Sequence, residues 1–436
     1  MITTAYINLW KKRVGAIAWD IDSQLASFEF DPAFLNHNWN IAPLKMSIAG
    51  AERQIFSFPN LIGSKTFKGL PGLLADVLPD KYGNTLINAW LAQNGRPENS
   101  LNPIEMLCFI GERGMGALEF EPVVPKANGR STKVEIDGLV QIAQEILSGR
   151  QDFHTNLSTN EKKALVEILK VGTSAGGARA KALIAYNATT GAVRSGQANA
   201  LKGFTHWLIK FDGVTDDQLS SGKGPLSTST GYGRVEMAYH NMAIDCGIEM
   251  TECKLLEENG RAHFMTQRFD RIPGKGKIHV QSFCAIQHYD FSQITSFSYE
   301  QLFQTMRILH LPYPQAEQLF KRMAFNVIAR NCDDHTKNFA FIMDKKGEWK
   351  LSPAYDLCHS YRPGSPWVSQ QSLSVNGKRR DISTQDLLDV ARQMNIKRAE
   401  LSIEKVVETV GRWIEYAEKQ KVPDDIAKAI KATLLA

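Results

Sequence analysis

The sequence lacks paired cysteines. Six cysteines are scattered along 436 residues without a CxxC pair or a histidine at zinc-finger spacing, namely Cys108, Cys246, Cys253, Cys284, Cys332 and Cys358. Neither a disulfide framework nor a structural zinc site is therefore indicated. We expect reduced thiols and a reducing compartment.

Long apolar runs and a secretory signal are also missing. No segment approaches the roughly 20 apolar residues that a membrane-spanning helix requires. The start of the chain, Met1 to Tyr6, shows no positive region followed by an apolar stretch and a small-residue cleavage site. We expect a cytoplasmic protein with no membrane partner.

Charge of one sign is in only small excess. The net charge of +5 arises from 51 basic and 46 acidic residues, which implies no more than mild attraction to polyanions. Hydrophobic residues make up 43% and charged residues 22%, the balance of a globular enzyme. A chain of 436 residues exceeds one ordinary core, so we expect two or three packed lobes.

Composition shifts divide the chain. Short strand-like runs between turn signals occupy residues 3–60, a helical pattern covers 69–112, and a stretch rich in proline, asparagine and glycine at 123–133 is typical of a linker. The predicted domains are residues 1–122, a β-rich and then helical N-terminal module; 134–265, a lobe with a glycine-rich loop; and 266–436, a mainly helical lobe.

Within the two later lobes, several elements are expected. Strands are predicted at 181–186 and 205–211, and a helix at about 233–246. A short hairpin is predicted from 339–343 and 348–351. These elements flank the segments that carry the candidate chemistry.

The segment Asn331-Cys332-Asp333-Asp334-His335-Thr336-Lys337-Asn338 is the most specific, with Asp356 eighteen residues beyond Asn338. Protein kinases place a catalytic aspartate five residues before an asparagine, and a metal-binding aspartate after a short hairpin. On this pattern Asp333 orients the attacking hydroxyl and accepts its proton, while Asn338 and Asp356 hold Mg²⁺ against the ATP phosphates. A solvated acidic turn would not explain all three positions.

Upstream, Lys210 ends an apolar strand and Glu236 lies early in the next helix. This order matches the strand lysine and helix glutamate that grip the α- and β-phosphates in kinases. A lysine at a strand end is often simply solvated, so the position between a glycine-rich loop and the acidic motif is what favours the functional interpretation.

The glycine-rich stretch from Gly172 to Lys181 matches neither GxxxxGK[ST] nor GxGxxG. Its backbone N–H groups can still form an anion-binding nest, with Lys181 as a point charge beside the phosphates. The alternative is a turn between lobes.

Together these segments resemble HipA toxins. The resemblance rests on Ser174-Ala175-Gly176-Gly177-Ala178-Arg179-Ala180-Lys181, Gln267-Arg268-Phe269-Asp270-Arg271, Asp333 to Asn338 and Tyr355-Asp356, and in the N-terminal module on Leu78-Pro79-Asp80 and Gly111 to Ala117. It covers nearly the whole chain. The best-known member has Gln-Glu in place of Arg179-Ala180 and Gly in place of Asp334, and neither departure removes a proposed ligand.

The resemblance implies an α+β, two-lobed, protein-kinase-like fold with a small β-rich N-terminal module and a mainly helical C-terminal lobe. It implies Asp333 as the catalytic base and the backbone of Gln267, Arg268 and Phe269 as the adenine hinge. The other implied nucleotide contacts are Ala175, Gly176, Gly177, Ala178, Arg179, Ala180, Lys181, Lys210, His335 and Lys337. The implied cofactors are ATP and Mg²⁺.

The resemblance also implies that Ser174 is autophosphorylated in trans, which ejects the loop and switches the kinase off. A phosphate adds about −1.5 to −2 charges to a loop that must cradle ATP phosphates, so repulsion would open it. Thr173 is an alternative acceptor, and Ser174 as a turn former is the alternative role.

Further implied partners are a small helix-turn-helix antitoxin of the HipB type, operator DNA reached through it, and a protein substrate such as an aminoacyl-tRNA synthetase. The basic turn Lys378-Arg379-Arg380 can touch phosphates, although such clusters are usually solvated surface. Two alternatives stay open: a small-molecule phosphotransferase of the antibiotic-kinase kind, and a catalytically silent corepressor that binds antitoxin. A neighbouring reading frame for a helix-turn-helix protein would favour a toxin system.

Overall fold

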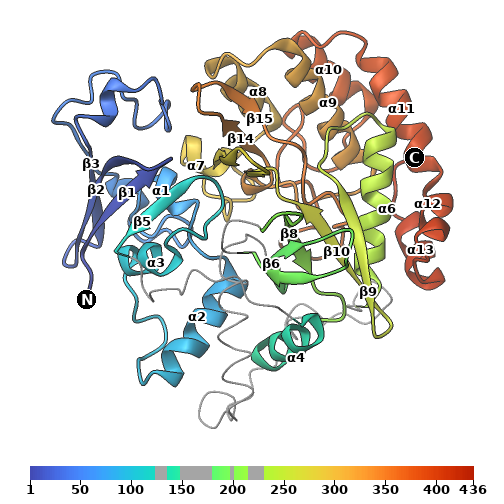
Figure 1. The fold of residues 1–436 in the computed structure, drawn as a ribbon. Coiled ribbons are helices and arrows are strands. Elements are labelled where there is room, and N and C mark those ends of the chain that lie inside the picture. Colours follow the sequence, from blue (N-terminus) through green and yellow to red (C-terminus); the bar gives the residue numbers. More distant parts are fainter. Residues whose placement is uncertain (123–134, 148–178, 197–200, 215–229) are drawn as a thin grey trace.

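The computed structural model describes residues 1–122, 135–147, 179–196, 201–214 and 230–436 (Figure 1). The predicted linker at 123–133 and most of the segment between the strand at 205–211 and the next helix lie outside the described residues. No helix in the described ranges is long and apolar enough to cross a membrane.

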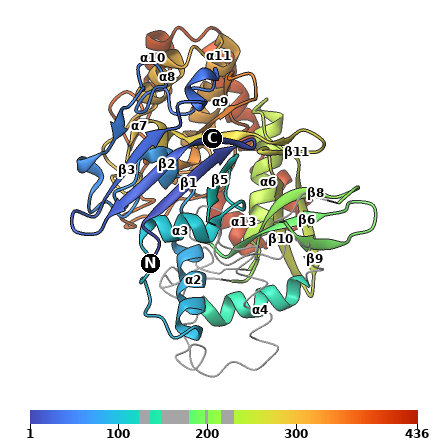
Figure 2. The same cartoon turned by 60° about the vertical axis from the view of Figure 1, so that its left-hand side comes forward.

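The N-terminal module is built on a five-stranded antiparallel sheet of order β4-β3-β2-β1-β5. Its elements are β1 (Thr4–Leu9), β2 (Lys12–Asp20), β3 (Leu25–Phe30), β4 (Ile55–Phe56), β5 (Leu118–Glu121), the 3₁₀ turns Phe34–Asn36 and Pro59–Leu61, and helices α1 (Gly72–Ala75), α2 (Lys81–Gln93) and α3 (Pro103–Ile110). The strands lie side by side and α3 packs on the sheet (Figure 2). Alternating strand residues such as Ile7 and Phe28 are fully buried and form the core of this module.

A second antiparallel sheet has the order β7-β6-β8-β10-β9. Its strands are β6 (Lys181–Tyr186), β7 (Val193–Ser195), β8 (Thr205–Lys210), β9 (Cys253–Glu258) and β10 (Arg261–Gln267), and helices α4 (Ile136–Leu147) and α6 (Tyr232–Asp245) accompany it. The predicted strands and helix at these positions are confirmed. Gly233 allows α6 to approach the sheet, because a Cβ there would lie 1.9 Å from the carbonyl oxygen of Ala262.

The C-terminal lobe is mainly helical, as predicted. Its elements are β11 (Arg271–Ile272), β12 (Gly276–Lys277), β13 (His279–Ser282), α7 (Phe283–Gln287), α8 (Tyr299–Ile308), α9 (Tyr313–Ile328), the 3₁₀ turn Thr336–Asn338, β14 (Ala340–Met343), β15 (Trp349–Leu351), α10 (Thr384–Met394), α11 (Ala399–Gly411), α12 (Trp413–Lys419) and α13 (Asp424–Lys431). The predicted hairpin is β14–β15, and β13 extends it to three strands.

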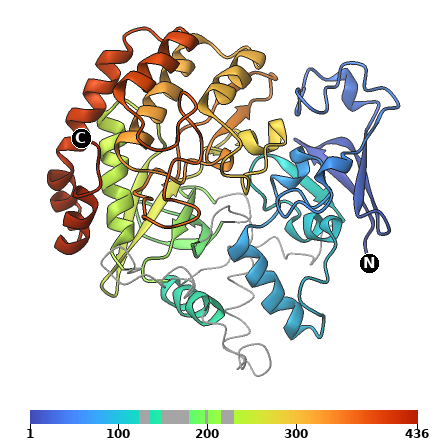
Figure 3. The ribbon, with the colours of Figure 1, turned by 180° about the vertical axis from the view of Figure 1, so that it is seen from behind.

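Shared cores join these parts. Helix α6 contributes Tyr239 and Met242 to the core of the C-terminal lobe, where they meet Phe325 and Trp413. Helices α2 and α4 contribute to one core with the second sheet. The N-terminal sheet and helices α10 to α13 lie on opposite sides of the molecule, and the second sheet lies between them (Figures 1 and 3).

Candidate active site

The loop that carries Asp333 is anchored by the next residue, Asp334, whose side chain is completely buried. Its carboxylate accepts hydrogen bonds from the Tyr299 hydroxyl (2.7 Å), the Gln371 side-chain amide (3.0 Å) and the Ser372 backbone N–H (2.6 Å). Burial raises the pKa of Asp334 to about 6, although these hydrogen bonds oppose the rise. Where the best-known HipA has glycine, this chain therefore has an internal anchor for the loop.

Asp333 consequently faces outward with a half-exposed carboxylate. Removal of water by the surrounding protein raises the pKa of Asp333 above its usual range, while His335 opposes the rise. The His335 Nε2 lies 3.8 Å from the Asp333 carboxylate. The side-chain amide of Asn338 donates to the Asp333 carbonyl (2.6 Å), which closes the loop between the two motif residues. A carboxylate with a raised pKa is a better proton acceptor than an ordinary one.

Lys210, at the end of β8, brings three charged residues together. Its ammonium lies 2.8 Å from the buried Glu236 of α6 and also contacts the Asp356 carboxylate. Burial lowers the pKa of Lys210, but Asp356 and Glu236 outweigh it and the net shift is upward. The strand lysine and helix glutamate predicted from chain order thus meet, and the predicted metal ligand adjoins them.

Asp356 has a left-handed backbone with φ of 54°. Burial raises the pKa of Asp356, but the Lys210 and Lys181 ammonium groups outweigh this effect, so the pKa lies below its usual range and the carboxylate is ionised. The neighbouring Tyr355 donates its hydroxyl proton to the Lys337 carbonyl (2.7 Å), which ties this segment to the catalytic loop.

The residues predicted to supply oxygen ligands to a divalent cation are Asp356 and Asn338. Because the Asn338 amide nitrogen donates to Asp333, its Oδ1 atom has no hydrogen-bond donor among the described residues. No group of three histidine, cysteine or acidic side chains gathers in the described ranges. Mg²⁺ usually takes one or two protein oxygens and completes its shell with phosphate and water oxygens, so this pair fits it.

Lys181 is directly opposite Lys210 in the pairing of β6 with β8, so both side chains project from the same face of the sheet. Lys181 is only 2% exposed, and its ammonium lies 3.1 Å from Asp80 of the N-terminal module. Asp80 also caps α2 by accepting from the Gly83 N–H (2.7 Å). In the sequence Asp80 stands within a family motif, and nothing there indicates that it pairs with Lys181.

Replacing Asp80 with asparagine is expected to destabilise the nucleotide-free protein by about 1–3 kcal/mol, because Lys181 loses a charged hydrogen bond. Asparagine preserves the α2 cap. If Lys181 contacts ATP phosphates, as predicted, bound ATP replaces the missing negative charge. Thermal unfolding with and without ATP and Mg²⁺ should then show a larger nucleotide-induced rise in Tm for the variant than for wild type or for the exposed control Asp425→Asn. Equal rises would show that Lys181 does not contact the phosphates.

The predicted hinge segment lies at the end of β10. The N–H groups of Gln267 and Arg268 donate to the carbonyls of Glu252 (2.8 Å) and His206 (2.9 Å). The Phe269 ring lies 5.8 Å from the Tyr355 ring, which places it beside Asp356. Nucleotide contacts from this backbone stay a prediction.

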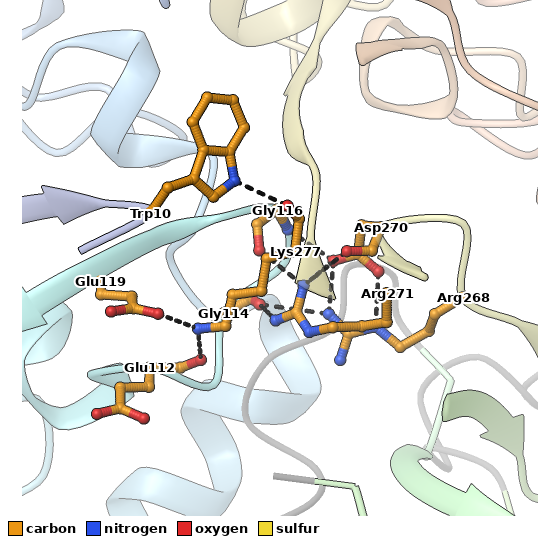
Figure 4. Close-up of polar contacts among 9 residues, drawn as sticks. All are labelled: Trp10, Glu112, Gly114, Gly116, Glu119, Arg268, Asp270, Arg271 and Lys277. Carbon is orange, nitrogen blue, oxygen red and sulfur yellow. Dashed lines mark hydrogen bonds and ion pairs between the residues drawn. The ribbon is translucent and has the colours of Figure 1, made fainter. Parts of the chain in front are cut away.

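The Arg268 side chain serves a different purpose. Its buried guanidinium forms two hydrogen bonds with Asp270 (2.8 and 2.7 Å) and reaches the Gly114 carbonyl (3.3 Å) of the N-terminal module (Figure 4). Arg271 also bonds to Asp270 (2.7 Å) and to the carbonyls of Gly114 (2.8 Å) and Gly116 (2.7 Å). Two of the motifs that carry the family resemblance therefore bind each other and fix the N-terminal module next to the hinge segment.

The remaining predicted residues are distributed as follows. Arg179 lies over the Tyr232 ring (4.4 Å) and 3.9 Å from Glu236. Ala180 is buried and its carbonyl accepts from the Phe211 N–H (3.0 Å). The Lys337 ammonium lies over the Phe291 ring at 5.0 Å. The predicted autophosphorylation site, Ser174, and the predicted nucleotide contacts Ala175, Gly176, Gly177 and Ala178 lie outside the described residues.

A strand lysine paired with a helix glutamate, beside an Asp–Asn–Asp constellation on a helical lobe, defines a kinase-like, two-lobed protein. Family models agree: the HipA N-terminal domain matches residues 5–121, and the HipA-like C-terminal domain matches residues 173–414, more than half of the chain. The protein belongs to the HipA family.

Individual relatives are distant. A chain from the complex of HipA, HipB and operator DNA of the Shewanella oneidensis MR-1 toxin–antitoxin system has the same fold, with a TM-score of 0.65 at 16% identity over 99% of this chain and 96% of that one. Two Sinorhizobium fredii (strain NBRC 101917 / NGR234) proteins whose names describe them as candidate kinases also match. Y4dM is 26% identical over 46% of this chain, and Y4mE is 24% identical over 38%. These matches span 52% and 40% of the two relatives' own lengths.

Proposed function

We propose that this protein is an ATP- and Mg²⁺-dependent serine/threonine protein kinase, the toxin of a HipA-type toxin–antitoxin system. The observation that carries the proposal is the contact of Lys210 with both Glu236 and Asp356, beside an outward-facing Asp333 on an anchored loop. Phosphoryl transfer depends mainly on positioning and charge neutralisation, and these residues supply both.

Each residue then has a role. Asp333 orients the acceptor hydroxyl and takes its proton, which its raised pKa favours. Lys210 and Lys181 lie on the face where the phosphates would bind, and Asn338 and Asp356 supply oxygen ligands for Mg²⁺. The metal, when bound, would neutralise charge on the phosphate oxygens.

The partners follow from the family. The Shewanella oneidensis complex contains HipB and operator DNA, which supports a HipB-like helix-turn-helix antitoxin here and DNA binding through it. We further propose a cytoplasmic location, a translation component such as an aminoacyl-tRNA synthetase as substrate, and autophosphorylation of Ser174.

The test is intact-mass and phosphopeptide analysis of wild type and Asp333→Ala after incubation with ATP and Mg²⁺. One added phosphate on the Ser174 peptide, in wild type only, is the expected result. Nucleotide binding without any phosphate in either protein, starting from unmodified Ser174, would instead favour the silent corepressor or a kinase restricted to another substrate. A phosphate on Thr173 would reassign the acceptor.

A further inference from the structure

A cavity of about 200 Å³ lies on the segment that follows the predicted metal ligand. Three arginines line it, Arg330, Arg379 and Arg380, together with one carboxylate, Asp381, and the Tyr361 ring. Three positive charges against one negative charge leave the cavity with a net positive charge. None of the residues assigned to phosphoryl transfer lines it.

Arg330 has a left-handed backbone, with φ of 55°. Glycine adopts this left-handed conformation without strain, whereas a long side chain does so at a cost. The side chain is also held in place, because its Nε donates to the Thr433 carbonyl (2.9 Å) and its guanidinium lies over the Tyr361 ring (4.5 Å). Arg330 directly follows the C-cap of α9, a place where left-handed residues commonly end helices, and its guanidinium lines the cavity.

The other two arginines are held by neutral groups. Arg379 donates to the carbonyls of Ser372 and Phe297, and Arg380 donates to the Gln370 side chain (3.0 Å). Within the described ranges, no carboxylate lies at ion-pair distance from any of the three guanidinium groups. Their charges are therefore available to an anion from outside the chain.

The cavity is tied to the catalytic loop. The Ser360 N–H donates to the Arg330 carbonyl (3.0 Å), and the Cys332 N–H donates to the Ser360 carbonyl (3.1 Å). Arg330 precedes Asp333 by three residues, so their Cα atoms lie at most about 11 Å apart. An extended peptide advances about 3.3 Å per residue. When the acceptor hydroxyl of a substrate peptide lies at Asp333, a residue of the same peptide within about four positions of that hydroxyl can therefore reach the cavity.

We propose that this cavity binds an acidic or phosphorylated side chain of the protein that presents the acceptor hydroxyl. The inference rests on the proposed kinase function and adds a substrate preference to it. A concave site beside the catalytic loop suits a single side chain of a peptide, whereas nucleic-acid phosphates call for a surface that follows a continuous backbone. Planar, bidentate guanidinium groups suit both a carboxylate and a phosphate.

The test measures binding, so that it does not depend on turnover. The probes are fluorescent degenerate peptides with alanine at the acceptor position. Each peptide carries one aspartate or one phosphoserine, and the position of this residue is varied across the series from −4 to +4 relative to the acceptor. Matched control peptides carry asparagine or serine at the same position. Anisotropy should show about tenfold tighter binding of the charged peptides at one offset. The aspartate and phosphoserine series tell which anion is preferred.

The double variant Arg330→Gly/Arg380→Gln should lose this preference, and glycine suits the left-handed backbone. The matched control is Arg398→Gly/Arg392→Gln, which also removes two arginine charges and also places glycine at a left-handed arginine, with φ of 53°. Equal binding of charged and neutral peptides, or a preference that survives in the double variant, would overturn the proposal. So would binding of a random DNA duplex that the double variant abolishes while acidic peptides bind no better than neutral ones. The kinase function is tested separately, by the intact-mass and phosphopeptide comparison of wild type with Asp333→Ala.

Discussion

Replacing Asp356 with asparagine is expected to slow phosphoryl transfer by on the order of 10²- to 10³-fold, the usual effect of removing one preorganised electrostatic element. The carboxylate contacts Lys210 and its pKa is depressed, so it carries a full negative charge at neutral pH. Asparagine has the same shape without the charge, and it tolerates the left-handed backbone at this position. Lys210 retains Glu236 as its partner, so the fold should persist.

Two measurements separate the cause. Single-turnover phosphoryl transfer at saturating ATP should fall, and the Mg²⁺ concentration needed for half-maximal nucleotide binding should rise. Asp425→Asn, an exposed change of the same kind on α13, should alter neither. If the variant transfers phosphate at a rate within threefold of wild type, the assignment of Asp356 as a metal ligand is wrong.

Three of the residues proposed for phosphoryl transfer could be chosen from the sequence because their spacing is local. Asp333 and Asn338 belong to one loop, and Asp356 follows a hairpin whose two strands have clear signals. Lys210 and Glu236 were matched by chain order alone, and the structure brings them together because β8 pairs with β10 and α6 packs against β10.

Positions that depend on distant contacts could not be predicted in this way. Asp80 reaches Lys181 across 101 residues, and no periodicity reports such a pairing. Asp334 was noted only as a departure from the best-known member, whereas the structure shows it anchoring the loop. Arg268 was assigned to the nucleotide only through its backbone, and the sequence did not show that its side chain reaches the N-terminal module. The sequence did hold a signal for this contact between the two family motifs, Gly111 to Ala117 and Gln267 to Arg271. Both motifs are rich in residues to which no chemical role was assigned.

The junction of those motifs gives the prediction with the largest effect on stability. Asp270 is completely buried between Arg268 and Arg271 and accepts the Gly116 N–H (2.8 Å). Burial raises the pKa of Asp270, but the two arginines outweigh it and the net shift is strongly downward. Because the pKa is depressed in the folded state, the stabilisation is present above the unfolded-state pKa of about 4 and is lost as the pH falls.

Asp270→Asn should therefore lower the free energy of unfolding by about 3–5 kcal/mol at neutral pH, since it leaves two buried guanidinium groups without their carboxylate. Urea unfolding at pH 7 measures the loss. The difference in unfolding free energy between variant and wild type should narrow towards pH 3, because the unfolded-state carboxylate takes up a proton there while the native carboxylate stays ionised. Asp389→Asn breaks the exposed pair with Arg392 and should have a much smaller effect. An Asp270→Asn protein no less stable than this control would mean that hydrogen bonds to neutral groups, and not the buried charges, hold the N-terminal module to the kinase-like lobes.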